Sequence, residues 1–279
     1  MDARIKFAHD ALGNQNMAPT DKILARKEAG VGLVTFNNPE RHNAVSLEMW
    51  EATKEALDAF AADNEVRVVV LTGAGGKAFV SGADISKFAS ERASIEATRA
   101  YDVVTAAAFN SVYEFPKPTI AMIRGYCIGG GAALAVCCDL RVCTDNSVFA
   151  VPAAKLGLGY GYAGLKRLSD VVGPSFAKEI FYTARQFTAA EALTMGLVNR
   201  MVPSAELEAA VKGITDAICA NAPLTIKAVK FAVGEILKDE SARDMTRVET
   251  MVEACFASAD YTEGRTAFME KRKPVFTGS

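Results

Sequence analysis

The stretch that decides the fold is Ile123-Arg-Gly-Tyr-Cys-Ile-Gly-Gly-Gly-Ala-Ala-Leu-Ala135. Residues 119–124 have the pattern of a buried strand, and the small residues at 132–138 predict a helix. Glycines between a strand and a helix expose the unpaired backbone N–H groups at the positive end of the helix, which stabilise an oxyanion. A glycine triplet alone more often serves close packing, so an oxyanion site needs a second feature.

A second glycine cluster supplies that feature: Leu71-Thr-Gly-Ala-Gly-Gly-Lys-Ala-Phe-Val-Ser-Gly-Ala-Asp84. It follows a β-branched run at 66–72 and would turn another backbone N–H, near Ala83, into the same cleft. Taken by itself, the stretch is a glycine-rich loop before a helix capped by Asp84. Neither cluster has the spacing of a phosphate-binding loop or of a dinucleotide-binding motif, so a nucleotide-binding protein is disfavoured.

The pattern on either side alternates strands and helices and predicts an α/β fold. The predicted strands are 23–28 and 31–37, which form a hairpin through Ala29-Gly30, and then 66–72, 119–124 and 140–144. The predicted helices are 46–62, 93–115 and 132–138, and from Pro174 onward the pattern is mainly helical, including 189–195 and 224–237. We therefore divide the chain into a loosely structured segment at 1–22, an α/β core at 23–210 and a helical region at 211–279.

Composition excludes several classes of protein. The chain has 279 residues, half of them hydrophobic, and a formal net charge of -2. No whole-chain positive field exists to attract nucleic acid or an anionic membrane. No apolar run reaches the ~18 residues of a membrane span, the N-terminus lacks the apolar stretch of a secretory signal, and the six cysteines lack paired spacing. The expectation is a cytoplasmic protein with reduced thiols and no nucleic-acid or membrane partner.

Taken together, the two clusters and their flanks resemble the enoyl-CoA hydratase/isomerase, or crotonase, family. The matching segments are Asn38-Pro-Glu-Arg-His-Asn-Ala44, residues 72–84, residues 116–139 and Phe187-Thr-Ala-Ala-Glu-Ala-Leu-Thr-Met-Gly-Leu-Val198, in the family's order. The resemblance implies a crotonase-like spiral of ββα units with a helical C-terminal trimerisation region. It also implies a homotrimer or a homohexamer.

The resemblance further implies an acyl-CoA ligand and the residues that contact it. The backbone N–H groups of Ala83 and Gly130 would form an oxyanion hole for the thioester carbonyl. The path of the CoA chain would be lined by Arg41, His42, Ala44, Asp84 and Ile85. No cofactor is expected beyond the coenzyme A moiety, and with only His9 and His42 in the chain neither a histidine-rich metal site nor a Ser-His-Asp triad is predicted.

Two positions depart from the family's pattern. Hydratases of the family carry one catalytic glutamate three residues after the middle glycine of the triplet, where this chain has Ala133, and another after a proline, where it has Ala153. Adding water to an enoyl double bond needs an activating base and a protonating acid, and a methyl group supplies neither. Ordinary hydratase activity is therefore not expected.

Replacement chemistry has several candidates. The resemblance places Tyr160 and Tyr162 at the border of the acyl pocket, where they would hydrogen-bond a substrate carboxylate. A role in packing explains the two tyrosines equally well. Glu114, Asp139 and Glu179 are possible stand-in carboxylates, and Lys87, Arg124 and Lys155 possible cations, although such cations are usually solvated. Two alternatives stay open beside an enolate-forming lyase or isomerase: an acyl-CoA decarboxylase, and a non-catalytic acyl-CoA binding protein.

Overall fold

The computed structural model describes residues 18, 20–84, 87 and 93–279. Its core repeats one unit, in which a strand of a main sheet, a short strand of a second sheet and a helix follow each other. The units are β3 (Val68–Gly73), β4 (Ala78–Val80) and α3 (Ile95–Tyr113), then β5 (Thr119–Ile123), β6 (Tyr126–Ile128) and α4 (Gly130–Cys137), then β7 (Leu140–Thr144), β8 (Val148–Ala150) and α5 (Tyr162–Thr183). This is the spiral of ββα units that the family resemblance implies.

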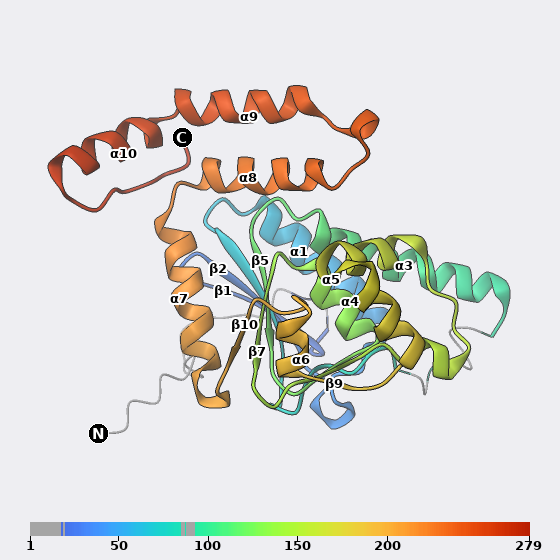
Figure 1. Cartoon of the computed structure of the whole chain (residues 1–279). Helices are drawn as coiled ribbons and strands as arrows, with labels where there is room; N and C mark the ends of the chain where they lie inside the picture. The colour runs from blue at the N-terminus through green and yellow to red at the C-terminus, as the bar shows by residue number, and fades with distance from the viewer. Residues whose placement is uncertain (1–17, 19, 85–86, 88–92) are drawn as a thin grey trace, which may run out of the picture.

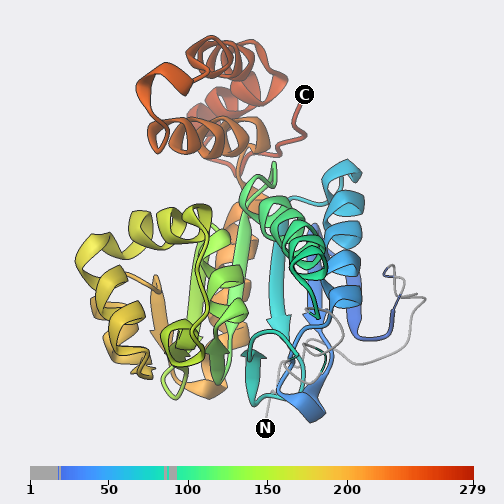
Figure 2. The same ribbon diagram turned by 90° about the vertical axis from the view of Figure 1, so that its right-hand side faces the viewer.

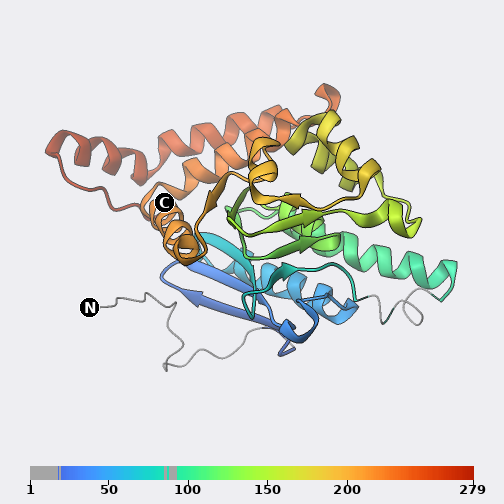
Figure 3. The same ribbon diagram turned by 60° about the horizontal axis from the view of Figure 1, so that its bottom comes forward.

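The main sheet is parallel except at one edge. Its order is β1-β2-β3-β5-β7-β10, with β1 (Ile23–Glu28) antiparallel to β2 (Val31–Phe36) and β10 (Arg200–Val202) parallel to β7. The predicted hairpin is confirmed, and its turn uses positive φ at Ala29 (46°) and Gly30 (84°), as a tight hairpin requires. Figure 3 shows β1 and β2, in blue, at the outer edge of the sheet.

Both faces of the main sheet are covered, and its central strands β3 and β5 carry no charged residue and are largely apolar, as buried parallel strands are. Alternate residues of β3 and β5 enter different cores: Val69 and Ala121 face one, whereas Val68 and Ile120 face the other. Helices α1 (Leu47–Ala62), α3, α4 and α5 cover the first face, and α7 (Leu207–Ala220) covers the second (Figures 1 and 2). The division at 210/211 that we drew from the sequence falls inside α7.

A smaller sheet lies beside the carboxyl ends of the main strands. Its order is β4-β6-β8-β9, with β9 at Phe187–Thr188, followed by α6 (Ala189–Thr194). These strands are two or three residues long, which is too short to produce the two-residue alternation that reveals a strand in a sequence. The sequence analysis therefore missed them, although they place the two glycine clusters side by side.

Helix α5 is the largest element that the sequence did not predict. It begins at Tyr162, before Pro174, and contains a non-helical residue, Gly173, with φ 76° and ψ 161°. Gly173-Pro174 breaks the helix into two segments, and the first segment follows a glycine-rich stretch that reads as a loop. This first segment forms a wall of the candidate site.

The C-terminal part consists of α8 (Pro223–Ile236), α9 (Met245–Ala257) and α10 (Ala259–Glu270), which project beyond one end of the core (Figures 1 and 2). The chain returns along α10, where the backbone N–H groups of Thr277 and Gly278 donate to the Asp260 carboxylate at 2.7 and 2.9 Å. No helix in the described ranges is long and apolar enough to cross a membrane.

Candidate active site

A cavity of about 440 Å³ opens between α3, α4, the first half of α5 and the 3-10 turn at Pro152–Leu156. Its wall is mainly apolar, and Ser81, Gly82 and Ala83 of the glycine cluster at 71–84 meet Gly129 and Gly130 of the cluster at 123–135 there. The larger apolar lining residues include Trp50, Phe109, Ile128, Leu156, Leu158 and Leu168. A cavity of this size, apolar with a few polar groups, suits a small organic ligand.

The backbone N–H of Ala83 is available in this cavity. Val45 pairs with Ala83 in a parallel bridge in which Val45 N donates to Gly82 O at 2.9 Å and Asp84 N donates to Val45 O at 3.0 Å. In such a bridge the N–H of the central residue points away from the partner strand. Within the described part of the chain, Ala83 N–H donates to no backbone carbonyl.

The second donor is at the first residue of α4. Gly130 N–H has no preceding helical carbonyl to bond, because the first N–H groups of a helix are unpaired, and it donates to no backbone carbonyl among the described residues. A Cβ on Gly130 would lie 3.8 Å from Ala83 N. The two donors therefore lie close together, at the positive end of a helix.

The glycines around these donors have separate tasks. Gly82 and Gly129 have φ of 110° and 55°, which most other residues adopt only with strain. Gly131 instead permits close packing, because a Cβ there would collide with the carbonyl oxygen of Val80. Packing and donor geometry, which the sequence analysis treated as alternatives, are both present in this one triplet.

Ala133 and Ala153 line the same cavity as the two donors. Ala133 lies one turn after Gly130 in α4, and Ala153 lies in the 3-10 turn that also lines the cavity. The fold thus brings together the four positions that the sequence associated with one reaction centre.

The two tyrosines are separated. Tyr160 lines the cavity and packs edge-on against Phe181, with ring centroids 4.7 Å apart. Burial, and then the neighbouring Cys137, raise the pKa of Tyr160 to about 12, so its hydroxyl stays protonated. Tyr162 is 80% exposed and is not among the residues that line the cavity.

Four of the residues expected along the CoA path lie next to Ala83, either in sequence or through the Val45–Ala83 bridge and the bond from Ser81 N to His42 O at 3.2 Å. Arg41 Nη1 contacts both carboxylate oxygens of Asp84 at 3.2 Å, and the His42 ring lies 6.1 Å from that of Tyr126. Ala44 O accepts a hydrogen bond from Asn38 Nδ2 at 2.9 Å. Ile85 lies outside the described residues.

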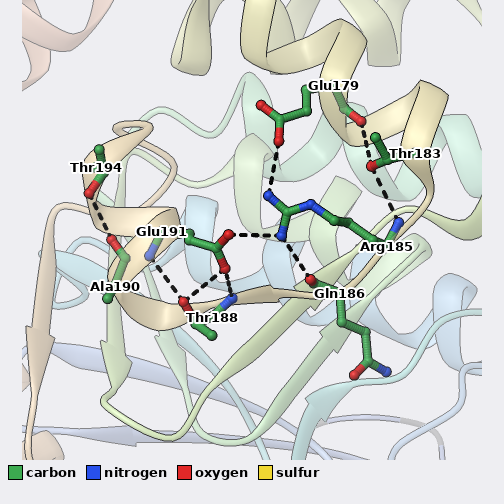
Figure 4. A network of polar contacts seen from close by, with 8 residues as sticks. All are labelled: Glu179, Thr183, Arg185, Gln186, Thr188, Ala190, Glu191 and Thr194. Atoms are coloured by element: carbon green, nitrogen blue, oxygen red, sulfur yellow. Dashed lines mark hydrogen bonds and ion pairs between the residues drawn. The ribbon is translucent and has the colours of Figure 1, made fainter.

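None of the stand-in carboxylates proposed from the sequence lines the cavity. Glu179 forms an ion pair with Arg185 at 2.9 Å, and Arg185 also binds Glu191, which closes a capping box with Thr188 at the start of α6 (Figure 4). Asp139 binds Lys230 at 2.7 Å, and Glu114 is exposed at the end of α3. The ion pairs of Glu179 and Asp139 therefore join parts of the fold outside the cavity.

Of the cations proposed from the sequence, Arg124 binds Glu208 at 2.7 Å and Lys155 is exposed. Neither they nor Lys87 is among the residues that line the cavity.

The cavity instead contains polar residues that the sequence analysis did not select. Asp102 of α3 is the one carboxylate among its described lining residues, and Arg167 of α5 is the one cation. Arg167 Nη2 donates to Asn110 Oδ1 at 2.6 Å, and its Nη1 donates to Cys137 Sγ at 3.5 Å. The signal for Asp102 and Asn110 was their position on the face of α3 that also carries Tyr101, Thr105 and Phe109.

Comparison with known proteins gives a consistent result. The sequence model of the enoyl-CoA hydratase/isomerase family matches residues 26–279. The chain is 36% identical over 256 residues to the crotonyl-CoA hydratase of Syntrophomonas wolfei, which covers 92% of this chain and 98% of that protein. It is 35% identical over 253 residues to the short-chain-enoyl-CoA hydratase of Clostridium acetobutylicum, covering 91% and 96%.

Solved structures show the same similarity in three dimensions. An enoyl-CoA hydratase/carnithine racemase from Magnetospirillum magneticum superposes with a TM-score of 0.89 at 37% identity, covering 95% of this chain and 99% of that one. An enoyl-CoA hydratase from Bacillus anthracis superposes with a TM-score of 0.84 at 30% identity, covering 92% and 100%.

Proposed function

The chain belongs to the enoyl-CoA hydratase/isomerase family, and from that premise we propose that it binds an acyl-CoA thioester and stabilises an enolate of its acyl group. The observation that carries the proposal is the pair of N–H groups at Ala83 and Gly130, which lie on the wall of one cavity and donate to no backbone carbonyl of the described residues. Two backbone donors aimed at a thioester oxygen stabilise the negative charge that develops there when the α-carbon becomes carbanionic. Such preorganised donors need no reorganisation during the reaction.

The proposal excludes efficient hydration by the two-glutamate mechanism. The family resemblance assigns the catalytic carboxylates to Ala133 and Ala153, and both side chains are methyl groups on the cavity wall. Each positioned acid or base typically contributes ~10²–10⁴-fold. Asp102 is exposed and is the only described lining residue that offers a carboxylate in their place.

A second candidate reaction is decarboxylation of an acyl-CoA whose α-carbon carries a carboxylate. It is favoured by Tyr160, which lines the cavity and whose hydroxyl has no hydrogen-bond partner among the described residues. The bond between the α-carbon and the carboxylate breaks, its electron pair moves into the thioester enolate, and CO₂ leaves. The α-carbon then takes a proton from water, so that no carboxylate of the protein is required.

The proposal is tested with a panel of thioesters: crotonyl-CoA, longer 2-enoyl-CoA, 3-enoyl-CoA, malonyl-CoA and methylmalonyl-CoA. Products are followed by mass spectrometry and binding by calorimetry. We expect binding across the panel, little hydration of crotonyl-CoA, and product from a substrate that reacts through an enolate. Binding without product from any member would favour a non-catalytic acyl-CoA binding protein, and no binding at all would contradict the proposal.

We also propose that the chain assembles into a homotrimer or homohexamer through α8–α10. Large apolar side chains on these helices are exposed, among them Phe256 at 62%, Phe268 at 82% and Met269 at 80%. Residues of α8, α9 and α10 also line a second apolar cavity, of about 740 Å³. Contiguous exposed apolar surface of this kind marks an interface with another protein surface.

A further inference from the structure

Arg167 is the one cation among the described residues that line the mainly apolar cavity, and no anionic side chain of the described residues is among its contacts. Its guanidinium lies over the Tyr113 ring, 4.3 Å from the centroid, and donates to Asn110 Oδ1 and Cys137 Sγ. These bonds occupy two of the five N–H donors of a guanidinium. No carboxylate of the described residues forms an ion pair with it.

The side chains that Arg167 contacts, those of Asn110, Cys137 and Tyr113, are neutral. The carboxylate one turn further along α5, Asp170, forms its ion pair with Lys166 at 2.7 Å. Burial raises the pKa of the Cys137 thiol to about 11 against the opposing effect of Arg167 itself, so the sulfur is not a thiolate. Asn110 and Tyr113 carry no charge at neutral pH. Asp102, the carboxylate on the same cavity wall, precedes Asn110 by eight residues of α3, which is ~12 Å along the helix.

Tyr160 belongs to the same polar cluster. It is close enough to Cys137 for the two groups to influence each other electrostatically, and it lines the cavity together with Cys137 and Arg167. Its protonated hydroxyl is a hydrogen-bond donor. The cluster therefore presents a planar cation and an O–H donor to whatever fills the cavity, and these are the groups that recognise a carboxylate.

We infer that Arg167, with Tyr160, selects thioesters whose acyl group itself carries a carboxylate. This inference rests on the proposed function, since it assumes that an acyl-CoA occupies the cavity, and it adds the chemical class of the acyl group. An acyl chain that is wholly apolar leaves the cation without an anionic partner. A carboxylate on the acyl chain would accept charge-assisted hydrogen bonds from the N–H groups of the guanidinium that are not already bonded to Asn110 or Cys137.

The test compares pairs of thioesters of the same shape. Succinyl-CoA is paired with 4-methylpentanoyl-CoA, and glutaryl-CoA with 5-methylhexanoyl-CoA, so that a branched apolar end replaces each carboxylate. The carboxylate of succinyl-CoA and of glutaryl-CoA is not attached to the α-carbon, so losing CO₂ would not give a thioester enolate. Calorimetry therefore records binding alone. We expect the wild-type protein to bind the carboxylate member of at least one pair roughly 10- to 100-fold more tightly, as hydrogen bonds to charged groups imply.

Variants then assign that preference to Arg167. Arg167→Gln is expected to abolish the preference while keeping the affinity for the apolar member, and Arg167→Lys to restore part of it. Lys178→Gln, which removes an exposed cation from the same helix, is the matched control and should leave the preference unchanged.

The outcomes separate the two proposals. Equal affinity for both members of each wild-type pair would overturn the inference and leave the proposed function standing. A loss of affinity for both members in Arg167→Gln would show that Arg167 only supports the fold of the cavity, which also overturns it. Failure of every thioester to bind would contradict the proposed function and the inference with it.

Discussion

Gly130 is the residue on which the proposed chemistry depends, because its N–H is one of two donors and its side of α4 carries no Cβ. A Cβ at Gly130 would meet only ordinary contacts, the nearest being Trp50 Cζ2 at 3.6 Å. We therefore expect the protein to tolerate a methyl group at position 130, as in Gly130→Ala, but not the loss of the backbone N–H there.

Gly130→Pro removes this donor at the first position of a helix, where proline is well accommodated. We expect turnover to fall ~10²–10³-fold, the usual effect of losing one oxyanion donor, while Gly130→Ala keeps most of it. Steady-state kinetics measure the change, and circular dichroism checks that both variants fold. Equal activity of the two variants would show that Gly130 N–H is not a donor to the substrate.

The contribution of Tyr160 to binding is expected to be independent of pH between 6 and 9. Because burial raises its pKa to about 12, the neutral form is the one that the folded protein favours, and it donates a hydrogen bond at every pH below that value. We expect Tyr160→Phe to weaken binding of a carboxylate-bearing thioester by the same factor at pH 6, 7.5 and 9, as measured by calorimetry. A factor that changes across this range would mean that another titrating group is responsible.

The sequence identified Ala83, Gly130, Ala133 and Ala153 because each lies in a short motif with fixed spacing. Arg167 was not found, because it meets Asn110 across 57 residues of chain on two helices and has no local pattern that marks it. Asn110 was missed although it shares a face of α3 with Phe109. Tyr160 and Tyr162 could not be distinguished, since a two-residue separation at the start of an unpredicted helix does not tell which side chain faces inward.

At the scale of elements, α4 is held against β4 by the absence of a side chain at Gly131. Gly131→Ala would bring a Cβ into the Val80 carbonyl, which is backbone and cannot rotate away. Overpacking of this kind typically costs about 1–3 kcal/mol, even though alanine is the better helix former. Urea unfolding should show this loss for Gly131→Ala and little or none for Gly130→Ala, and comparable stability of both would contradict the packing account.

The chain end after α10 gives a prediction for acid. Arg272, and then Val275 N–H, hold the pKa of the Glu263 carboxyl at about 2, below its ordinary 4.5. A depressed acid pKa contributes stability that is fully present above the unfolded value and is lost as the pH falls toward the folded one. Protection of the 271–279 backbone in hydrogen exchange should therefore fall between pH 4.5 and 2.

Glu263→Gln tests this assignment. At pH 6 the 271–279 backbone of the variant should be less protected from hydrogen exchange than that of the wild-type protein. Between pH 4.5 and 2 the variant should lose less of that protection. An unchanged pH dependence would assign the acid sensitivity to another carboxylate.

The elements that the sequence predicted best are those with long, regular patterns: the β1–β2 hairpin, α1, α3 and the buried strands of the main sheet. The short strands β4, β6 and β8 escaped because three residues contain too little periodicity. They form through tertiary pairing, in which β6 lies between β4 and β8, and this pairing is what brings Ala83 and Gly130 together.

At the scale of the whole molecule, the proposed oligomer should depend on the apolar surface of α8–α10. Replacing Phe268, which is 82% exposed, by glutamate places a charge on that surface without removing a core residue. We expect light scattering coupled to size-exclusion chromatography to show a trimer or hexamer for the wild-type protein and smaller species for Phe268→Glu. A wild-type monomer would contradict the proposed assembly.

We propose that this protein has kept an oxyanion hole of its family without the carboxylates that hydration requires. The decisive experiment compares the rate of crotonyl-CoA hydration by the wild-type protein with the rate of the double variant Ala133→Glu/Ala153→Glu. We predict a poor wild-type rate that rises at least ~10²-fold in the double variant, because the new acid and base would meet a hole already in place. Rapid wild-type hydration, unimproved by the two glutamates, would contradict the account.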